Sequence, residues 1–181
     1  LRYRKEYESL HFQEAFMNSD ARPDYTRLVF IPALITLAVT LLRLVSEFMN
    51  LPPWLASKEA GGAAALIGIS WLPPIFGVYF AAKLAHAPGK LWKNLLKTLL
   101  YYGLAARIPV IVIMGFAIFG DWGTHYDAFP PDMADMTPAM KFLFGAVLTQ
   151  LIFWAGIWTV GTGMLTGLIA AKLRSPKHAT A

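Results

Sequence analysis

The most constraining feature of this sequence is the near absence of charged side chains from four long apolar blocks. The blocks cover about residues 28–49, 63–84, 98–119 and 142–171, and the last holds thirty consecutive residues without a formal charge. A helix of about 20 apolar residues crosses the roughly 30 Å hydrocarbon core of a bilayer. The sequence therefore predicts an all-α, polytopic integral membrane protein, folded as a bundle of four transmembrane helices.

The remaining segments are too short to form a second, soluble domain. Only 15% of the residues are charged, against about 25% in soluble proteins. We divide the chain into an N-terminal segment (1–27), a transmembrane domain (28–171) and a tail (172–181). Aromatic and apolar residues at helical spacing in the first segment predict an amphipathic interfacial helix, with a solvated tail as the alternative.

Basic side chains are distributed unevenly between the connections. With four crossings, the N-terminal segment, the connection between the second and third blocks and the C-terminal tail share one side, which holds twelve Lys and Arg against two on the other. Cytoplasmic connections carry this excess, so both termini are predicted to be cytoplasmic, in a plasma or bacterial inner membrane. The twelve are Arg2, Arg4, Lys5, Arg22, Arg27, Lys83, Lys90, Lys93, Lys97, Lys172, Arg174 and Lys177, and the two are Lys58 and Lys141.

Prolines mark two helix irregularities. Pro73 and Pro74 lie near the middle of the second block and predict a kinked or broken helix, because they cannot donate to the carbonyl groups four residues earlier. We expect those carbonyls to accept hydrogen bonds from an arginine. Thr137 and Pro138 resemble a helix N-cap and first helical position, so the fourth helix is predicted to begin before residue 142. It is longer than a bilayer requires and should tilt, bend or protrude.

Each predicted span contains a polar side chain. Arg43 has a carboxylate four residues later on the same helix face, at Glu47, whereas Arg107 has no acidic residue one turn away. Counting from the span ends places these groups in a common central layer. The predicted intramembrane polar layer comprises Arg43, Glu47, Ser70, Arg107 and Gln150.

Two interpretations of this layer remain open. It either holds the four helices together or binds an anion and lines a path for a solute. A charge inside a bilayer costs roughly 3 kcal/mol or more, so both interpretations require partners for the arginines. Arginine stays protonated and cannot shuttle protons, which argues against a proton-coupled carrier.

The connection between the third and fourth blocks is acidic. Asp121, His125 and Asp127 form a weak candidate set for a divalent metal, since their spacing matches no strong motif. A turn-rich loop with Trp122 and Tyr126 at the headgroup level is the alternative. Either arrangement leaves a surface able to dock a partner.

The fourth block carries two further patterns. Gly163 and Gly167 form a small-residue pair that permits close helix approach, within the chain or between chains. Trp154 and Trp158 share one helix face, which predicts contact with lipid or, alternatively, with a partner subunit or a pigment.

The chemistry-bearing motifs of enzymes are missing from this sequence. There is no cysteine, no phosphate-binding or dinucleotide fingerprint, and no histidine inside a block to ligate haem. We expect no enzymatic activity, no cofactor and no binding of nucleic acid, since the basic residues flank apolar spans. Two functions remain: a structural or accessory subunit of a larger membrane complex, or a channel or transporter for a small, anionic solute.

Overall fold

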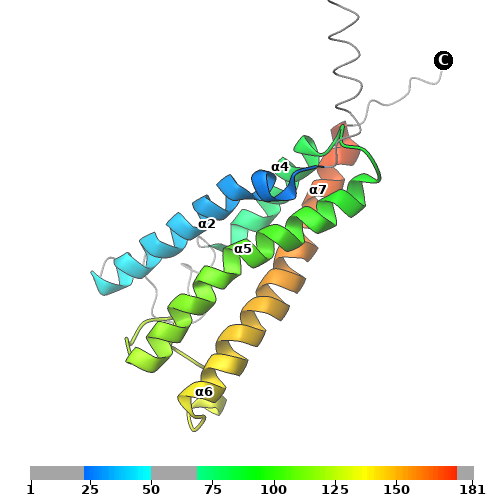
Figure 1. Ribbon diagram of the computed structural model, residues 1–181. Helices are drawn as coiled ribbons and strands as arrows, with labels where there is room; N and C mark the ends of the chain where they lie inside the picture. The colour runs from blue at the N-terminus through cyan, green and yellow to red at the C-terminus, as the bar shows by residue number, and fades with distance from the viewer. Residues whose placement is uncertain (1–22, 50–68, 175–181) are drawn as a thin grey trace, which may run out of the picture.

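The computed structural model describes residues 23–49 and 69–174, and all regular structure in them is helical. Three helices are long and apolar enough to cross a membrane (Figure 1): α2 (Tyr25–Phe48), α5 (Leu91–Gly120) and the continuous helix Pro138–Arg174. The last consists of α6 (Pro138–Met140), η3 (Lys141–Val160) and α7 (Gly161–Arg174). These helices correspond to the first, third and fourth predicted spans.

The second predicted span is described only in its later half. A 3₁₀ turn, η1 (Ile69–Trp71), leads into α4 (Leu72–Lys83), and Pro73 and Pro74 lie in the first turn of α4. Proline is tolerated there because the first N–H groups of a helix have no intrahelical acceptor. The start of this span at 63, and thus the count of four crossings, lies outside the described residues. So do most of the predicted N-terminal interfacial helix and the tail beyond residue 174.

The helices pack as a bundle in which α5 is central. It contacts α2 on one side and η3 on the other, and α4 packs along α7. The start of α2, the α4–α5 connection and the end of α7 lie at one end of the bundle, whereas the end of α2 and the α5–α6 connection lie at the other (Figure 1). The two described chain ends are therefore at the same end, as the predicted topology requires.

Aromatic packing fills one half of the core. The ring of Tyr102, on α5, makes edge contacts with Phe76 and Phe80 of α4 at centroid distances of 5.2 and 5.7 Å. Its hydroxyl shares a hydrogen bond of 2.8 Å with the Thr36 hydroxyl of α2. One buried tyrosine thus joins three helices. The other half of the core consists of Val110, Met114, Ala117, Tyr126 and Ala146.

Glycines set the spacing between α4 and α7. A Cβ atom at Gly77 would overlap the carbonyl group of Gly163, and one at Gly167 would lie 2.7 Å from the Gly77 carbonyl oxygen. The Thr166 hydroxyl donates to the Pro74 carbonyl at 2.8 Å across this contact. The predicted small-residue pair therefore serves an interface within the chain.

The long C-terminal helix changes its winding at Gly161. Residues Lys141–Val160 form a π-helix and the rest an α-helix. Buried positions in η3 recur at steps of four or five residues, because backbone hydrogen bonds between residues five apart put more residues into each turn. Those positions are Ala146, Gln150, Ala155 and Thr159, with Gly145 buried next to Ala146. This winding, which the sequence did not predict, places Gln150 on the inner face.

Large apolar side chains cover the outside of the bundle. They remain exposed along all three long helices, for example Phe30 and Leu42 on α2, Phe116 on α5, and Ile152 and Leu165 on the C-terminal helix. Contact with lipid tails satisfies such a surface, whereas soluble monomers rarely expose apolar patches beyond a few hundred Å². The exposed surface and the three apolar helices together indicate a membrane-embedded protein.

Candidate functional site

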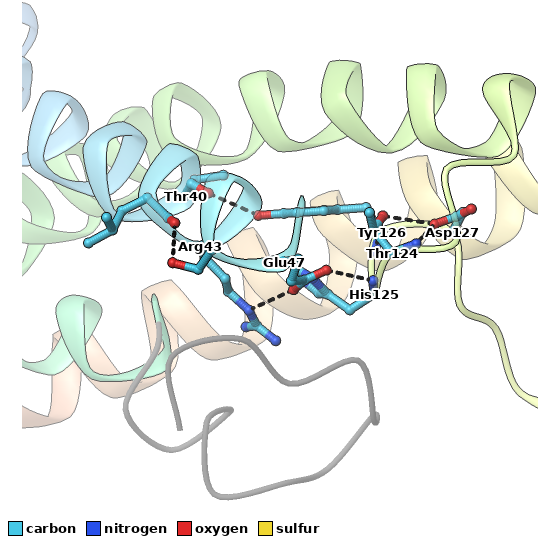
Figure 2. Close-up of polar contacts among 9 residues, drawn as sticks. Thr40, Arg43, Glu47, Thr124, His125, Tyr126 and Asp127 are labelled. Atoms are coloured by element: carbon cyan, nitrogen blue, oxygen red, sulfur yellow. Dashed lines mark hydrogen bonds and ion pairs between the residues drawn. The ribbon is translucent and has the colours of Figure 1, made fainter. Parts of the chain in front are cut away.

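A buried carboxylate joins α2 to the α5–α6 connection. The Glu47 side chain, in the last turn of α2, has no solvent exposure, and it points at the loop (Figure 2). One oxygen, Oε2, accepts the backbone N–H of His125 at 2.9 Å. The other, Oε1, contacts His125 Nδ1 and lies 3.6 Å from Arg43 Nε. We call Arg43, Glu47, His125 and Tyr126 the Glu47 cluster.

Local hydrogen bonds shape the loop that carries His125. The Asp127 carboxylate accepts the backbone N–H groups of Gly123 and Thr124 at 2.8 and 2.7 Å, and the Thr124 hydroxyl at 2.8 Å. Gly123 adopts a left-handed conformation, with φ of 63°, which glycine does without steric cost. This turn directs the His125 N–H towards Glu47.

Tyr126 holds the same loop about two turns further back along α2. Its hydroxyl donates to the Thr40 carbonyl at 3.2 Å, and its ring lies 3.8 Å from the His125 ring between centroids. Burial raises the pKa of Tyr126, so the hydroxyl stays protonated and able to donate. Two consecutive loop residues therefore contact α2 at points about two turns apart (Figure 2).

The charge of the cluster is balanced between Arg43 and Glu47. Burial lowers the pKa of His125; the Glu47 carboxylate opposes this shift and the Arg43 guanidinium adds to it. Because the net direction is downward from about 6.5, the imidazole is neutral at neutral pH. The cluster thus contains one cation, one anion and a neutral histidine.

Arg107 has an aromatic partner. Its side chain is buried, and the guanidinium carbon lies 4.9 Å from the centroid of the Trp154 ring on η3. Such cation–π contacts contribute about 2 kcal/mol when desolvated. Neither Arg107 Nε nor Gln150 Oε1 has a hydrogen-bond partner among residues 23–49 and 69–174. The Gln150 amide instead donates to Met114 Sδ at 3.5 Å.

The carbonyl freed by the α4 prolines binds a different donor from the expected one. The Ser70 carbonyl accepts a hydrogen bond of 2.9 Å from Trp158 Nε1, so an indole replaces the predicted arginine. Trp154 and Trp158 contact each other edge to face, at 6.2 Å between centroids. Both rings are half-buried and serve contacts within the chain, in addition to any contact with lipid.

The predicted polar residues therefore form separate groups instead of one network. Arg43 meets Glu47, Arg107 meets Trp154, and Gln150 meets Met114. Within the described ranges, no hydrogen bond or ion pair connects Arg43 with Arg107. Sequence reasoning missed the roles of Thr40, His125 and Tyr126, since nothing in the pattern says which span the loop folds back on.

The weak metal candidates have other roles. Asp121 ends α5 in a left-handed conformation, with φ of 48°, Asp127 forms the loop turn, and His125 contacts Glu47. No group of three potential metal ligands converges in the part of the chain that the structure describes.

Comparison with known proteins returns no relative. The chain matches no protein-family model, and neither a curated protein nor a solved structure is significantly similar to it. Its class therefore follows from the fold alone, as a helical membrane-embedded protein.

Proposed function

We propose that this chain is a non-catalytic integral membrane protein that serves as a structural or accessory subunit of a larger membrane complex. Its termini face the cytoplasm, in a plasma or bacterial inner membrane. The supporting observation is the Glu47 cluster, whose buried polar groups bind one another and fix a loop.

The Glu47 cluster attaches the α5–α6 connection to α2, and its carboxylate is poorly placed to act as a general base. Glu47 Oε2 accepts a backbone N–H, and Oε1 is enclosed by the side chains of His125 and Arg43 without forming a hydrogen bond within the described residues. A general base needs a lone pair free to approach a substrate. Hydrogen bonds to a buried carboxylate instead stabilise the folded loop by about 1.5–3 kcal/mol each.

The fixed loop presents a surface suited to docking. Asp121, Asp132 and Asp135 are exposed, and Trp122 is exposed beside Phe48, at 5.5 Å between ring centroids. A rigid surface loses little conformational entropy on binding. Acidic residues around an aromatic side chain fit a partner with basic side chains around an apolar pocket.

One observation favours the second candidate, a channel or transporter for a small anionic solute. Arg107 is buried in α5 with an unpartnered Nε atom, and its described partner is a neutral ring. A buried guanidinium without a carboxylate attracts anions. The structural role remains our first proposal because Trp154 already balances part of the cost of burial.

Purification from the native membrane in mild detergent tests the first proposal. We expect the chain to migrate with other polypeptides, and the double variant Asp132→Asn, Asp135→Asn to lose them. Lys141→Gln, at the same end of the bundle, is the matched control and should keep them. Migration as a lone chain or homo-oligomer would contradict the subunit role.

Flux measurements test the alternative. The purified chain in liposomes should pass chloride no faster than empty liposomes do. Chloride flux that disappears in Arg107→Gln, but persists in Lys141→Gln, would replace the structural proposal with the transport function.

A further inference from the structure

Basic side chains gather at the end of the bundle opposite the Glu47 cluster. Among the described residues, this end carries seven exposed Lys and Arg and one acidic residue, Asp24. The Asp24 carboxylate is occupied as the N-cap of α2, where it accepts the Arg27 N–H at 3.0 Å. We call the seven the basic end: Arg27, Lys83, Lys90, Lys93, Lys97, Lys172 and Arg174.

A polar bridge holds the middle of the basic end in a fixed shape. The Tyr25 hydroxyl donates to Asn94 Oδ1 at 3.0 Å, and Asn94 Nδ2 donates to the Pro88 carbonyl at 2.9 Å. The Tyr25 ring also stacks on Tyr101 at 5.9 Å. The start of α2, the α4–α5 connection and the start of α5 are thereby joined.

Two lysines of the basic end lie next to exposed aromatic rings. Lys93 Nζ lies 5.5 Å from the centroid of the Trp92 ring, and Lys83 Nζ lies 5.9 Å from that of Tyr79. Trp92 and Tyr79 are exposed. Amphipathic rings of this kind sit at the headgroup level of a bilayer, so the adjacent ammonium groups lie where lipid phosphates do.

The basic side chains have few competing partners within the chain. No ion pair between two residues of the described ranges includes any of the seven. Lys90, Lys93 and Lys97 recur at steps of three and four residues and follow one side of α5 at its start. A row of exposed cations beside the bilayer surface complements a row of anionic headgroups.

We propose that the basic end binds anionic phospholipid headgroups, with Lys90, Lys93 and Lys97 contacting the phosphates and Trp92 beside them at the headgroup level. Each basic residue near an anionic membrane surface contributes about 1 kcal/mol. Three such residues correspond to roughly a 100-fold preference for anionic over zwitterionic lipid. This inference requires only that the chain is embedded in a membrane, and it is independent of the proposed subunit role.

The proposal is tested by measuring, with native mass spectrometry, the affinity of the full chain in detergent micelles for added lipids. We expect phosphatidylglycerol to bind roughly 100-fold more tightly than phosphatidylcholine and to be released as salt is raised. The triple variant Lys90→Gln, Lys93→Gln, Lys97→Gln should lose most of this preference. Lys141→Gln, at the other end of the bundle, should keep it.

Three results would overturn the proposal. They are equal affinity for the two lipids, an unchanged preference in the triple variant, and displacement of the lipid by glycerol 3-phosphate at matched concentration, which would make the ligand a free phosphate. If the triple variant fails to fold, the single variants Lys93→Gln and Lys97→Gln replace it. Each should weaken phosphatidylglycerol binding by about fivefold, and no weakening in either would equally refute the proposal.

Discussion

Replacing Glu47 with alanine should loosen the α5–α6 connection from α2. The His125 backbone N–H would lose an ionised acceptor at 2.9 Å, which costs about 1.5–3 kcal/mol. Arg43 would lose the carboxylate 3.6 Å away; since its side chain is 17% exposed, water limits that cost to about 1 kcal/mol. We expect the free energy of unfolding to fall by about 3 kcal/mol in total.

The charge and the hydrogen bond can be measured separately. Glu47→Gln keeps an oxygen acceptor for the His125 N–H and removes the charge, so it should lose about 1–2 kcal/mol. Asp135→Ala removes an exposed carboxylate from the same connection and should change stability by less than about 0.5 kcal/mol.

Thermal unfolding in detergent, followed by tryptophan fluorescence, provides the assay. A loss of about 3 kcal/mol corresponds to a melting temperature about 6–12 °C lower for a chain of this size. Proteolysis within the α5–α6 connection should also accelerate in Glu47→Ala. A melting temperature within about 2 °C of the unmodified protein would refute the role assigned to this carboxylate.

Three further predictions concern packing, pH and the buried arginine. Gly163→Val should destabilise the protein by about 1–3 kcal/mol or more, because a Cβ atom at this position meets the Leu99 side chain. Gly161→Ala should not destabilise it, since the space around Gly161 is open. Equal melting temperatures for the two variants would contradict the close contact at Gly163. Because burial lowers the pKa of His125, the unfolded chain takes up that proton first, so stability should fall from about pH 6.5 downwards, and His125→Gln should reduce this fall in pH-dependent melting. Trp154→Leu should lower the free energy of unfolding by about 2 kcal/mol, because the cation–π contact with Arg107 is lost. In a chain that already carries Arg107→Leu, the same Trp154→Leu change should cost much less, as measured by melting temperature.

The sequence was sufficient to locate the long helices because charge is excluded from them. The predicted N-cap at Thr137 is also present, since its side chain accepts the Met140 N–H at 3.4 Å. The helix boundaries extend beyond the predicted spans, as α5 begins at Leu91 and not at 98. Hydropathy reports the bilayer core and is insensitive to helical turns that continue into the headgroup region.

The site was only partly predictable. The spacing of Arg43 and Glu47 was enough to pair them, because helix geometry is local. The contact of Glu47 with His125 joins residues 78 positions apart and depends on the fold of a loop. The prediction that an arginine donates to the Ser70 carbonyl was wrong. An uncharged indole N–H, that of Trp158, lies against this carbonyl once the helices pack.

The π winding of η3 also determines how far the C-terminal helix reaches. The advance per turn is set by the length of a hydrogen bond and is close to 5 Å in any such helix, so a turn that uses more residues advances less per residue. The 20 residues of η3 therefore cover a shorter distance than an α-helix of equal length. The π winding therefore takes up part of the extra length of this segment by widening the helix, without interrupting it with a loop.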